Sequence, residues 1–165
     1  MLDIDYSSLF QNFPPEVATL LIAMLPIAEL RAAIPVAIVG FDLPWWSSFI
    51  WSVVGNLIPA FFLLLFLEPV SQRLIRNSRH FEKFFNWVFQ RTRRRFSTNM
   101  EKYGKFIALV LFVAVPLPIT GAWTGSVAAF LFGIRFSRSF PAIIVGVLIA
   151  GIVVTLTTIG ITAFF

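Results

Sequence analysis

Long apolar runs dominate the sequence, and charged residues interrupt them at only a few places. Three segments contain no Asp, Glu, Lys or Arg: Leu43–Leu67, Phe106–Ile134 and Ser139–Phe165. Each is longer than the roughly 20 residues with which a helix crosses the hydrocarbon layer. The apolar residues are continuous and do not alternate with polar ones, which favours helices over strands. The pattern therefore predicts an all-α integral membrane protein whose first partner is the lipid bilayer.

The composition supports this prediction. Of the 165 residues, 58% are hydrophobic and 13% are charged, whereas soluble domains average about 45–50% apolar and roughly 25% charged residues. We expect a single membrane domain over residues 1–165. A chain of this length is too short to enclose a wide pore alone, so we expect a homo-oligomer, most simply a dimer.

The residue types that are present exclude several classes of chemistry. The chain contains no cysteine, which excludes disulfides, thiol catalysis and iron–sulfur clusters. The sequence offers no nucleophile–base pair, no cluster of metal-ligating residues and no phosphate-binding loop. We therefore expect a protein that is not an enzyme and that uses neither a cofactor nor a metal.

Two ionisable residues lie inside an otherwise apolar stretch. Glu29 and Arg31 interrupt the segment Val17–Phe41, and prolines flank them at positions 26 and 35. An ionisable side chain at membrane depth costs about 3 kcal/mol, so such residues face a cavity or a partner and mark functional sites. The pair predicts a polar site within the membrane.

Further prolines predict that two segments turn back inside the bilayer. The arm Val17–Leu25 ends at a proline, and so does the arm Phe106–Val115. Arms of nine or ten residues extend about 15 Å, half of the hydrocarbon thickness. We therefore predict two re-entrant hairpins, and the first returns through Ala32–Phe41. The competing interpretation is four ordinary spanning helices with kinks. The predicted hairpin-turn residues are Pro26, Pro35, Pro116, Pro118, Gly121 and Gly125.

Positive charge is concentrated between the two hairpins. The segment Pro69–Lys105 holds ten of the thirteen Lys and Arg residues, so the positive-inside rule predicts a cytoplasmic location and a multi-pass protein of the inner membrane. Apolar residues recur there at helical spacing, which predicts a basic amphipathic helix. The helix lies in the headgroup layer, packs on the cytoplasmic face of its own protein, or does both. Anionic lipid accounts for the basic run, so we expect no nucleic-acid partner.

The two halves of the chain resemble each other at an offset of 91 positions. Phe49 matches Phe140, and Val54–Ile58 matches Val145–Ile149 at four of five positions. The first hairpin would enter from outside and the second from inside, which makes an inverted-topology repeat of hairpin plus transmembrane helix. In transporters of that design the site lies near the midplane, where broken helices meet. The predicted segments are a surface segment 1–16, repeat 1 at 17–68, the cytoplasmic segment 69–105 and repeat 2 at 106–165.

The second tip adds uncharged polar groups to the predicted site. Thr120 and Thr124 offer hydroxyls, and Trp123 offers an indole donor. Asn56, inside an apolar span, is predicted to face the same cavity. Two roles remain open for Glu29. It carries a proton, because burial raises a carboxyl pKa and a nearby arginine lowers it, or it holds Arg31 in place. Arg31 is an anchor for an anionic group.

Two stretches, Pro26–Pro35 (PIAELRAAIP) and Pro116–Gly125 (PLPITGAWTG), resemble the signatures of the small multidrug export protein family of prokaryotic membranes. The resemblance covers approximately residues 17–160. That family is similar in layout to the DedA/VTT superfamily, whose two re-entrant hairpins carry acidic and arginine residues. The resemblance implies that Glu29 and Arg31 are the acidic and basic site residues. This chain departs from the DedA pattern at the second tip, which has threonines where an arginine is expected.

These observations predict a small secondary transporter, proton-coupled, with a midplane site formed by the two hairpin tips and a small-molecule or lipid substrate. The alternative is a flippase or scramblase of an anionic lipid carrier such as a polyprenyl phosphate. A third interpretation is a membrane scaffold that transports nothing.

Overall fold

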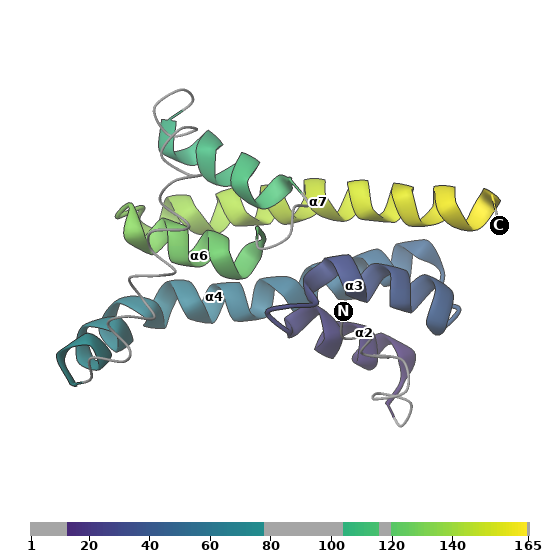
Figure 1. The fold of residues 1–165 in the computed structure, drawn as a ribbon, viewed down its shortest axis with the longest axis horizontal. Helices are drawn as coiled ribbons and strands as arrows, with labels where there is room; N and C mark the ends of the chain where they lie inside the picture. Colours follow the sequence, from purple (N-terminus) through teal and green to yellow (C-terminus); the bar gives the residue numbers. More distant parts are fainter. Residues whose placement is uncertain (1–12, 78–103, 116–119, 165) are drawn as a thin grey trace. The chain divides into compact units, whose positions relative to one another are not determined.

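A computed structural model describes residues 13–77, 104–115 and 120–164, with the backbone alone at 68–77 (Figure 1). These residues form helices joined by short connections, and no strand occurs among them. The all-α prediction is therefore confirmed for the described part of the chain. The elements are α2 (Pro15–Met24), α3 (Glu29–Pro35), the π-helix η1 (Val36–Gly40), α4 (Trp45–Asn77), an unlabelled helix Gly104–Ala114, α6 (Ala122–Leu131) and α7 (Phe136–Phe164).

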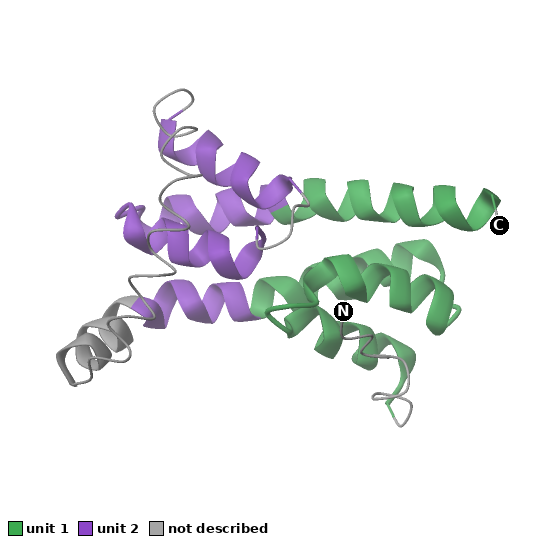
Figure 2. Cartoon of the chain, in the orientation of Figure 1, with its two compact units in different colours: residues 1–58, 147–165 green, residues 59–146 purple. Residues whose placement is uncertain are grey.

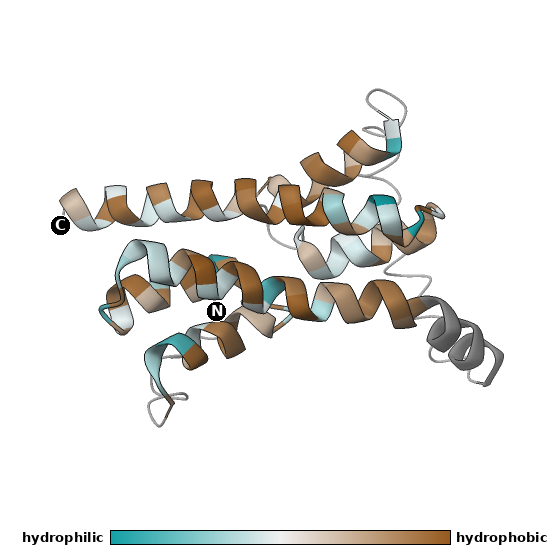
Figure 3. Ribbon diagram, turned by 180° about the vertical axis from the view of Figure 1, so that it is seen from behind, coloured by the Kyte–Doolittle hydropathy of each residue, from teal (hydrophilic) through white to brown (hydrophobic). Residues whose placement is uncertain are grey.

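Within the part of the chain that the structure describes, two helices are long and apolar enough to cross a membrane. They are Trp45–Leu67 within α4, with a mean hydropathy of 2.2, and Phe136–Phe164, with 2.6. Figure 3 shows both in mostly hydrophobic colours. The third charge-free segment, Phe106–Ile134, forms two short helices instead of one long helix. The segment is therefore not one continuous helix, and its re-entry into the membrane stays a prediction.

Prolines set the limits of the first hairpin. α2 begins at Pro15, where the missing N–H of proline costs nothing. It ends before Leu25, whose extended backbone (φ −71°, ψ 135°) is the conformation that the following Pro26 imposes. α2 and α3 pack against each other through a core of Ile22, Ala23 and Ala33. Pro26 therefore lies in the turn between two packed helices.

Pro35 does not lie at a turn, contrary to the sequence prediction. It is the last residue of α3, and the chain continues directly into η1. Proline has no N–H to donate, so the regular ladder is lost here and the chain can widen into a π-helical turn. The Phe41 N–H accordingly bonds the Val36 carbonyl oxygen at 3.1 Å, five residues back. The first return arm therefore runs through residues 29–40 with a change of helix type and no break.

The second hairpin begins and ends at one place. The helix Gly104–Ala114 leads out and α6 leads back, and the Lys105 ammonium donates a 3.0 Å hydrogen bond to the Phe132 carbonyl oxygen at the end of α6. Gly133 (φ 58°) closes α6 in the left-handed conformation, with the Ile134 N–H bonded to the Ala129 carbonyl oxygen at 2.8 Å. This is a Schellman ending, for which glycine is favoured.

The chain divides into two compact units, which Figure 2 colours separately. Unit 1 comprises Met1–Ile58 and Val147–Phe165, and unit 2 comprises Pro59–Gly146. Each unit therefore holds one hairpin and a part of both long helices. The limits of the units do not follow the predicted segments. α4 continues to Asn77, past the predicted boundary at 68. Most of the predicted amphipathic helix, residues 78–103, lies outside the described residues.

Unit 1 packs through small residues. A Cβ atom on Gly55 of α4 would collide with the backbone oxygen of Leu20 and lie 2.9 Å from the Ala23 Cβ. Glycine therefore allows α4 to lie directly against α2, the close approach that small residues give apolar helices. Within the same unit, a Cβ on Gly151 of α7 would lie 2.8 Å from the Phe49 ring.

Unit 2 is built in the same manner. A Cβ on Gly146 of α7 would lie 2.6 Å from the Val113 Cβ, and Gly125 of α6 also packs against Val113. The rings of Phe61, Phe136 and Phe140 form a cluster, with Phe61 edge-to-face on both partners at 5.6 and 5.5 Å between centroids. Val113 thus lies at the point where the outgoing helix meets both α6 and α7.

Candidate functional site

Glu29 lies at the break between α2 and α3 in an unusual conformation. It is the first residue of α3, its backbone has φ 48°, and only 6% of its surface is exposed. Its N–H bonds the Leu25 carbonyl oxygen at 2.9 Å, which closes the turn. A residue with a Cβ in the left-handed region costs about 1–2 kcal/mol relative to the ordinary helical conformation. Glycine would meet the backbone requirement without that cost, so the carboxylate is not there to make the turn.

Arg31 accompanies Glu29 on the same short helix. Its side chain is half-buried, and its guanidinium interacts electrostatically with the Glu29 carboxylate. Residues two apart on a regular helix point to different faces. The helix break at Glu29 removes this restriction, because the left-handed residue changes the direction in which its side chain leaves the backbone. The structure therefore brings together the two charged residues that the sequence singled out.

Buried polar groups without partners lie on the long helices of unit 1. Ser52 and Asn56 are fully buried and one helical turn apart on α4, and the Ser52 hydroxyl and both amide atoms of Asn56 have no hydrogen-bond partner. The hydroxyl of Thr155 on α7 also has none. A buried polar group that is left unpaired costs about 1–3 kcal/mol. Ser52 and Asn56 therefore form a polar strip that a water molecule or a polar ligand would stabilise.

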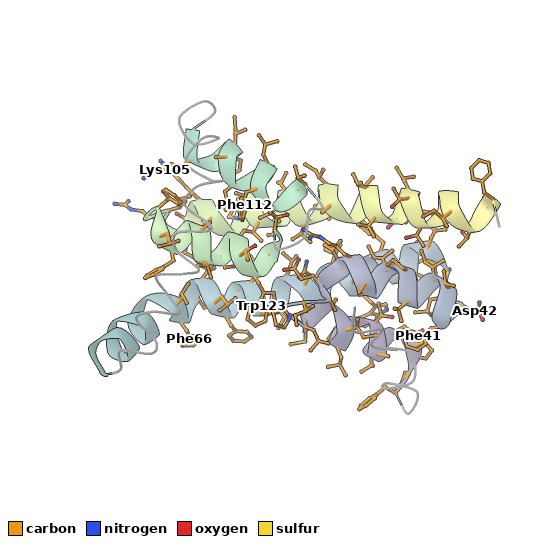
Figure 4. The ribbon with its side chains drawn as sticks, viewed as in Figure 1. Phe41, Asp42, Phe66, Lys105, Phe112 and Trp123 are labelled. Carbon is orange, nitrogen blue, oxygen red and sulfur yellow. The ribbon has the colours of Figure 1, made fainter. Side chains whose placement is uncertain are left out.

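The polar groups of the second tip bond the chain's own backbone. The Thr120 hydroxyl donates to the Val115 carbonyl oxygen at 2.8 Å. The Thr124 hydroxyl accepts a hydrogen bond from the Gly121 N–H at 3.0 Å, so it caps α6. Trp123, half-buried, lies on the first turn of α6 (Figure 4). The two hydroxyls therefore fasten the tip together and are not presented to a ligand in this conformation.

The other predicted turn residues have different fates. Gly121 precedes α6 and belongs to the turn, whereas Gly125 lies inside α6, contrary to the prediction of a turn residue there. Gly125 is needed for packing, because its Cβ would collide with a methyl group of Val113. Pro116 and Pro118 lie outside the described residues.

The candidate residues are divided between the two units. Glu29, Arg31 and Asn56 belong to unit 1, and Thr120, Trp123 and Thr124 belong to unit 2. A site shared by the two hairpin tips therefore stays a prediction. Unit 1 by itself offers a carboxylate that can gain or lose a proton, Glu29, and a guanidinium that can bind an anion, Arg31. Among the described residues no three His, Cys, Asp or Glu side chains lie together as a metal site.

The sequence analysis did not predict two of the three described residues in unit 1 whose buried polar atoms have no hydrogen-bond partner. Ser52 and Thr155 were not singled out, because serine and threonine are common in membrane helices, where their hydroxyls bond the carbonyl four residues earlier. Thr158 forms such a bond, because its hydroxyl donates to the Val154 carbonyl oxygen at 2.8 Å. A small hydrophilic residue four positions before Asn56 was the signal that could have identified Ser52.

Comparison with known proteins places residues 29–153, about three quarters of the chain, in the family described as "Putative small multi-drug export protein". The matched region begins at Glu29 and includes Arg31 and the whole second hairpin. No curated protein and no solved structure matches the chain.

Proposed function

Because the chain belongs to the putative small multi-drug export protein family, we propose that it is a proton-coupled secondary transporter in which Glu29 carries the proton. Family membership and the two long apolar helices support a transport function in a membrane. The proton role rests on one observation: a buried carboxylate is kept at a left-handed position that glycine would occupy at lower cost.

The coupling follows from the pairing of Glu29 with Arg31. When Glu29 is ionised, the guanidinium is neutralised by the carboxylate and the pair has no net charge. When Glu29 is protonated, Arg31 is released for an anionic group of the substrate. Proton binding at Glu29 and anion binding at Arg31 then favour each other, and linkage requires this effect to be reciprocal. In this proposal the polar strip of Ser52 and Asn56 orients a neutral part of the substrate.

We propose further that the two halves form an inverted repeat, which two pairs of equivalent contacts support. Gly55 of α4 and Gly146 of α7 are 91 positions apart, and each packs on the outgoing helix of its own hairpin. The backbone oxygen of Leu20 and the Cβ of Ala23 face Gly55, as those of Val110 and Val113 face Gly146. In both units the helix residues in contact are three apart.

The starts of the long helices supply the second pair. Ser48 and Ser139, also 91 apart, are both fully buried, and each hydroxyl bonds the carbonyl oxygen four residues earlier at 3.2 Å. The neighbouring rings behave alike, because Phe49 lies against Gly151 and Phe140 against Phe61. Position 60 is the equivalent of Gly151 at this offset, so the repeat predicts that Phe140 contacts position 60. The observed partner of Phe140 is Phe61, one residue away. These paired contacts support the repeat beyond the sequence identities alone.

The transport proposal is tested with the protein in liposomes that contain the pH-sensitive dye pyranine. Candidate substrates are added one at a time, and a substrate that moves protons is identified by the dye. Glu29→Gln should abolish this substrate-dependent proton movement. Glu16→Gln, which removes a carboxylate from the first turn of α2, is the matched control and should leave it intact. Unaltered proton movement in Glu29→Gln would refute the role of Glu29.

The same liposomes separate transport from the alternative of lipid-carrier translocation. A flippase or scramblase would move a fluorescent anionic lipid between leaflets without a proton gradient, and dithionite quenching of the outer leaflet measures that movement. We expect none above the rate in protein-free liposomes. Rapid quenching that Arg31→Gln removes would favour the lipid-carrier function.

The inverted arrangement is tested by cysteine accessibility, which is straightforward because the chain has no cysteine of its own. Cysteine is introduced by Asp42→Cys after the first hairpin or by Ser137→Cys after the second, and both positions are exposed. Two re-entrant hairpins that enter from opposite faces place Ser137 in the cytoplasm and Asp42 outside. Labelling of both from outside would contradict the proposal.

A further inference from the structure

A cavity of about 690 Å³ lies at the open end of the second hairpin, away from the tip of that hairpin. Its wall is formed by the start of the helix Gly104–Ala114, the end of α6 and the first turn of α7. The volume is in the range of pockets that hold small ligands. The lining residues are Gly104, Lys105, Phe106, Ile107, Gly133, Ile134, Arg135 and Arg138.

Three cations converge on this cavity. Apart from Arg31, every Lys or Arg whose side chain the structure describes lines it, namely Lys105, Arg135 and Arg138. No described carboxylate is among the lining residues. The two acidic residues of the preceding basic segment, Glu82 and Glu101, lie outside the described residues. The described wall therefore carries three positive charges and none that opposes them.

Hydrogen bonds hold the Lys105 ammonium and the backbone that carries the two arginines. Lys105 is held by its 3.0 Å hydrogen bond to the Phe132 carbonyl oxygen, and its ammonium keeps two further donors (Figure 4). Arg135, just before α7, and Arg138, in its first turn, are three positions apart, and the Arg138 N–H bonds the Arg135 carbonyl oxygen at 2.9 Å. Both side chains are exposed and lie within one helical turn of each other. The positive end of the α7 dipole is directed to the same place.

We propose that this cavity binds a phosphate group, and that the group belongs to the headgroup of an anionic phospholipid. Two guanidinium groups and one ammonium provide the planar and point-like donors that phosphate oxygens accept. The apolar part of the wall favours a lipid over free phosphate. Phe106 and Ile107 are 43% and 49% exposed beside the cations, and an acyl chain would cover them. Basic pockets between membrane helices bind lipid headgroups in this manner.

The proposal goes beyond transport, because it concerns a lipid that anchors the second hairpin and not a substrate. A bound headgroup would link the start of the hairpin, its end and the beginning of α7. These three segments carry Lys105, Ile134 and Arg135 respectively. Lipid binding would therefore stabilise the hairpin without contact with Glu29 or Arg31.

Native mass spectrometry of the full-length protein in detergent tests the proposal. Phosphatidylglycerol should bind more tightly than the zwitterionic phosphatidylcholine, and Arg135→Ala/Arg138→Ala should weaken phosphatidylglycerol binding about tenfold or more. Arg135→Lys/Arg138→Lys keeps the charge and loses the planar donors, so it should bind with intermediate affinity. Because both arginines are exposed, the variants should remain folded, which size-exclusion chromatography verifies.

Two further arms decide the source and the specificity of binding. Displacement of the lipid by millimolar inorganic phosphate would show that the cavity takes free phosphate, whereas retention identifies the lipid headgroup. Arg93→Ala/Arg94→Ala removes the same charge from the basic segment 69–105, which we expect to meet anionic lipid only at the membrane surface, so it should lower phosphatidylglycerol binding less than Arg135→Ala/Arg138→Ala does. Equal losses in both alanine variants, or equal binding of the two lipids by the native protein, would overturn the proposal.

Discussion

The turns of the two hairpins solve the same structural problem with different chemistry. Each connects a short outgoing helix to a short return helix, and each must satisfy backbone groups at the end of a helix. The second turn does so with hydroxyls, since Thr120 and Thr124 bond its own backbone. The first turn does so with backbone groups, since the Glu29 N–H bonds the Leu25 carbonyl oxygen, and Glu29 lies buried there in a left-handed conformation.

The difference indicates that the second tip uses its hydroxyls for structure, whereas the first tip carries ionisable groups. In the second turn the hydroxyls of Thr120 and Thr124 are hydrogen-bonded to the backbone. The packing of Gly125 on Val113 holds α6 against the helix Gly104–Ala114. The charged turn carries a conformational cost and retains two ionisable groups, Glu29 and Arg31. Strained residues of this kind persist where the surrounding structure determines them, and they cluster at functional sites.

The largest expected effect on stability comes from the equivalent glycine contacts, one behind each hairpin. Gly55→Ala and Gly146→Ala should each destabilise the protein by about 2–3 kcal/mol, because each new methyl group meets an atom that is held by the opposing helix. Gly160→Ala is the control, because no atom lies within 4 Å of its Cβ position. It should be neutral or stabilising, since alanine favours helices. Chemical unfolding in detergent measures all three.

The comparison of the hairpins would be broken by unequal results. If Gly55→Ala unfolds the protein and Gly146→Ala does not, the two contacts are not equivalent and the support for an internal repeat is lost.

A smaller effect isolates the backbone conformation of Glu29. Glu29→Gly and Glu29→Ala both remove the carboxylate, so their difference reports the cost of a Cβ at φ 48°. The glycine variant should be more stable by about 1 kcal/mol. The opposite order holds in an ordinary helix, where Ala32→Gly should destabilise. Equal stability, or a more stable alanine variant, would mean that the left-handed conformation is not maintained.

The smallest effect concerns the second tip. Thr124→Val removes the cap on the Gly121 N–H and should cost about 1 kcal/mol. Substrate-dependent proton movement, measured at a temperature where the variant is folded, should be unchanged. A loss of proton movement with native stability would show that the second tip binds ligand, and the contrast between the tips would fail.

The sequence predicted the helix breaks where the cause is local. Pro26 acts on the residue before it, so the end of α2 could be read directly from the chain. Pro35 misled the prediction, because a proline at the end of a helix can be absorbed by a π-helical turn. The charge-free segment Phe106–Ile134 could be a span or a hairpin by length alone. Its proline cluster favoured the hairpin, and two short helices are observed.

The candidate site was predictable in part. Charged residues in apolar surroundings are conspicuous, so Glu29 and Arg31 were found. Their mutual interaction was one of two roles left open for Glu29, and spacing could not decide it, because it depends on the left-handed backbone at Glu29. The hydroxyl of Thr124 looked available in the sequence, whereas in the folded chain it accepts the hydrogen bond of the Gly121 N–H. The matching role of Ser48 and Ser139 also escaped notice, since the repeat was traced through apolar residues.

The central claim is that Glu29 exchanges a proton inside the membrane. The most direct test is pH-difference infrared spectroscopy of the protein in lipid bilayers, because the carbonyl stretch of a protonated carboxyl group is separate from that of a carboxylate. We predict that a carboxyl band appears as the pH falls, that it is missing in Glu29→Gln, and that Glu16→Gln retains it. An identical set of bands in the native protein and Glu29→Gln would contradict the account.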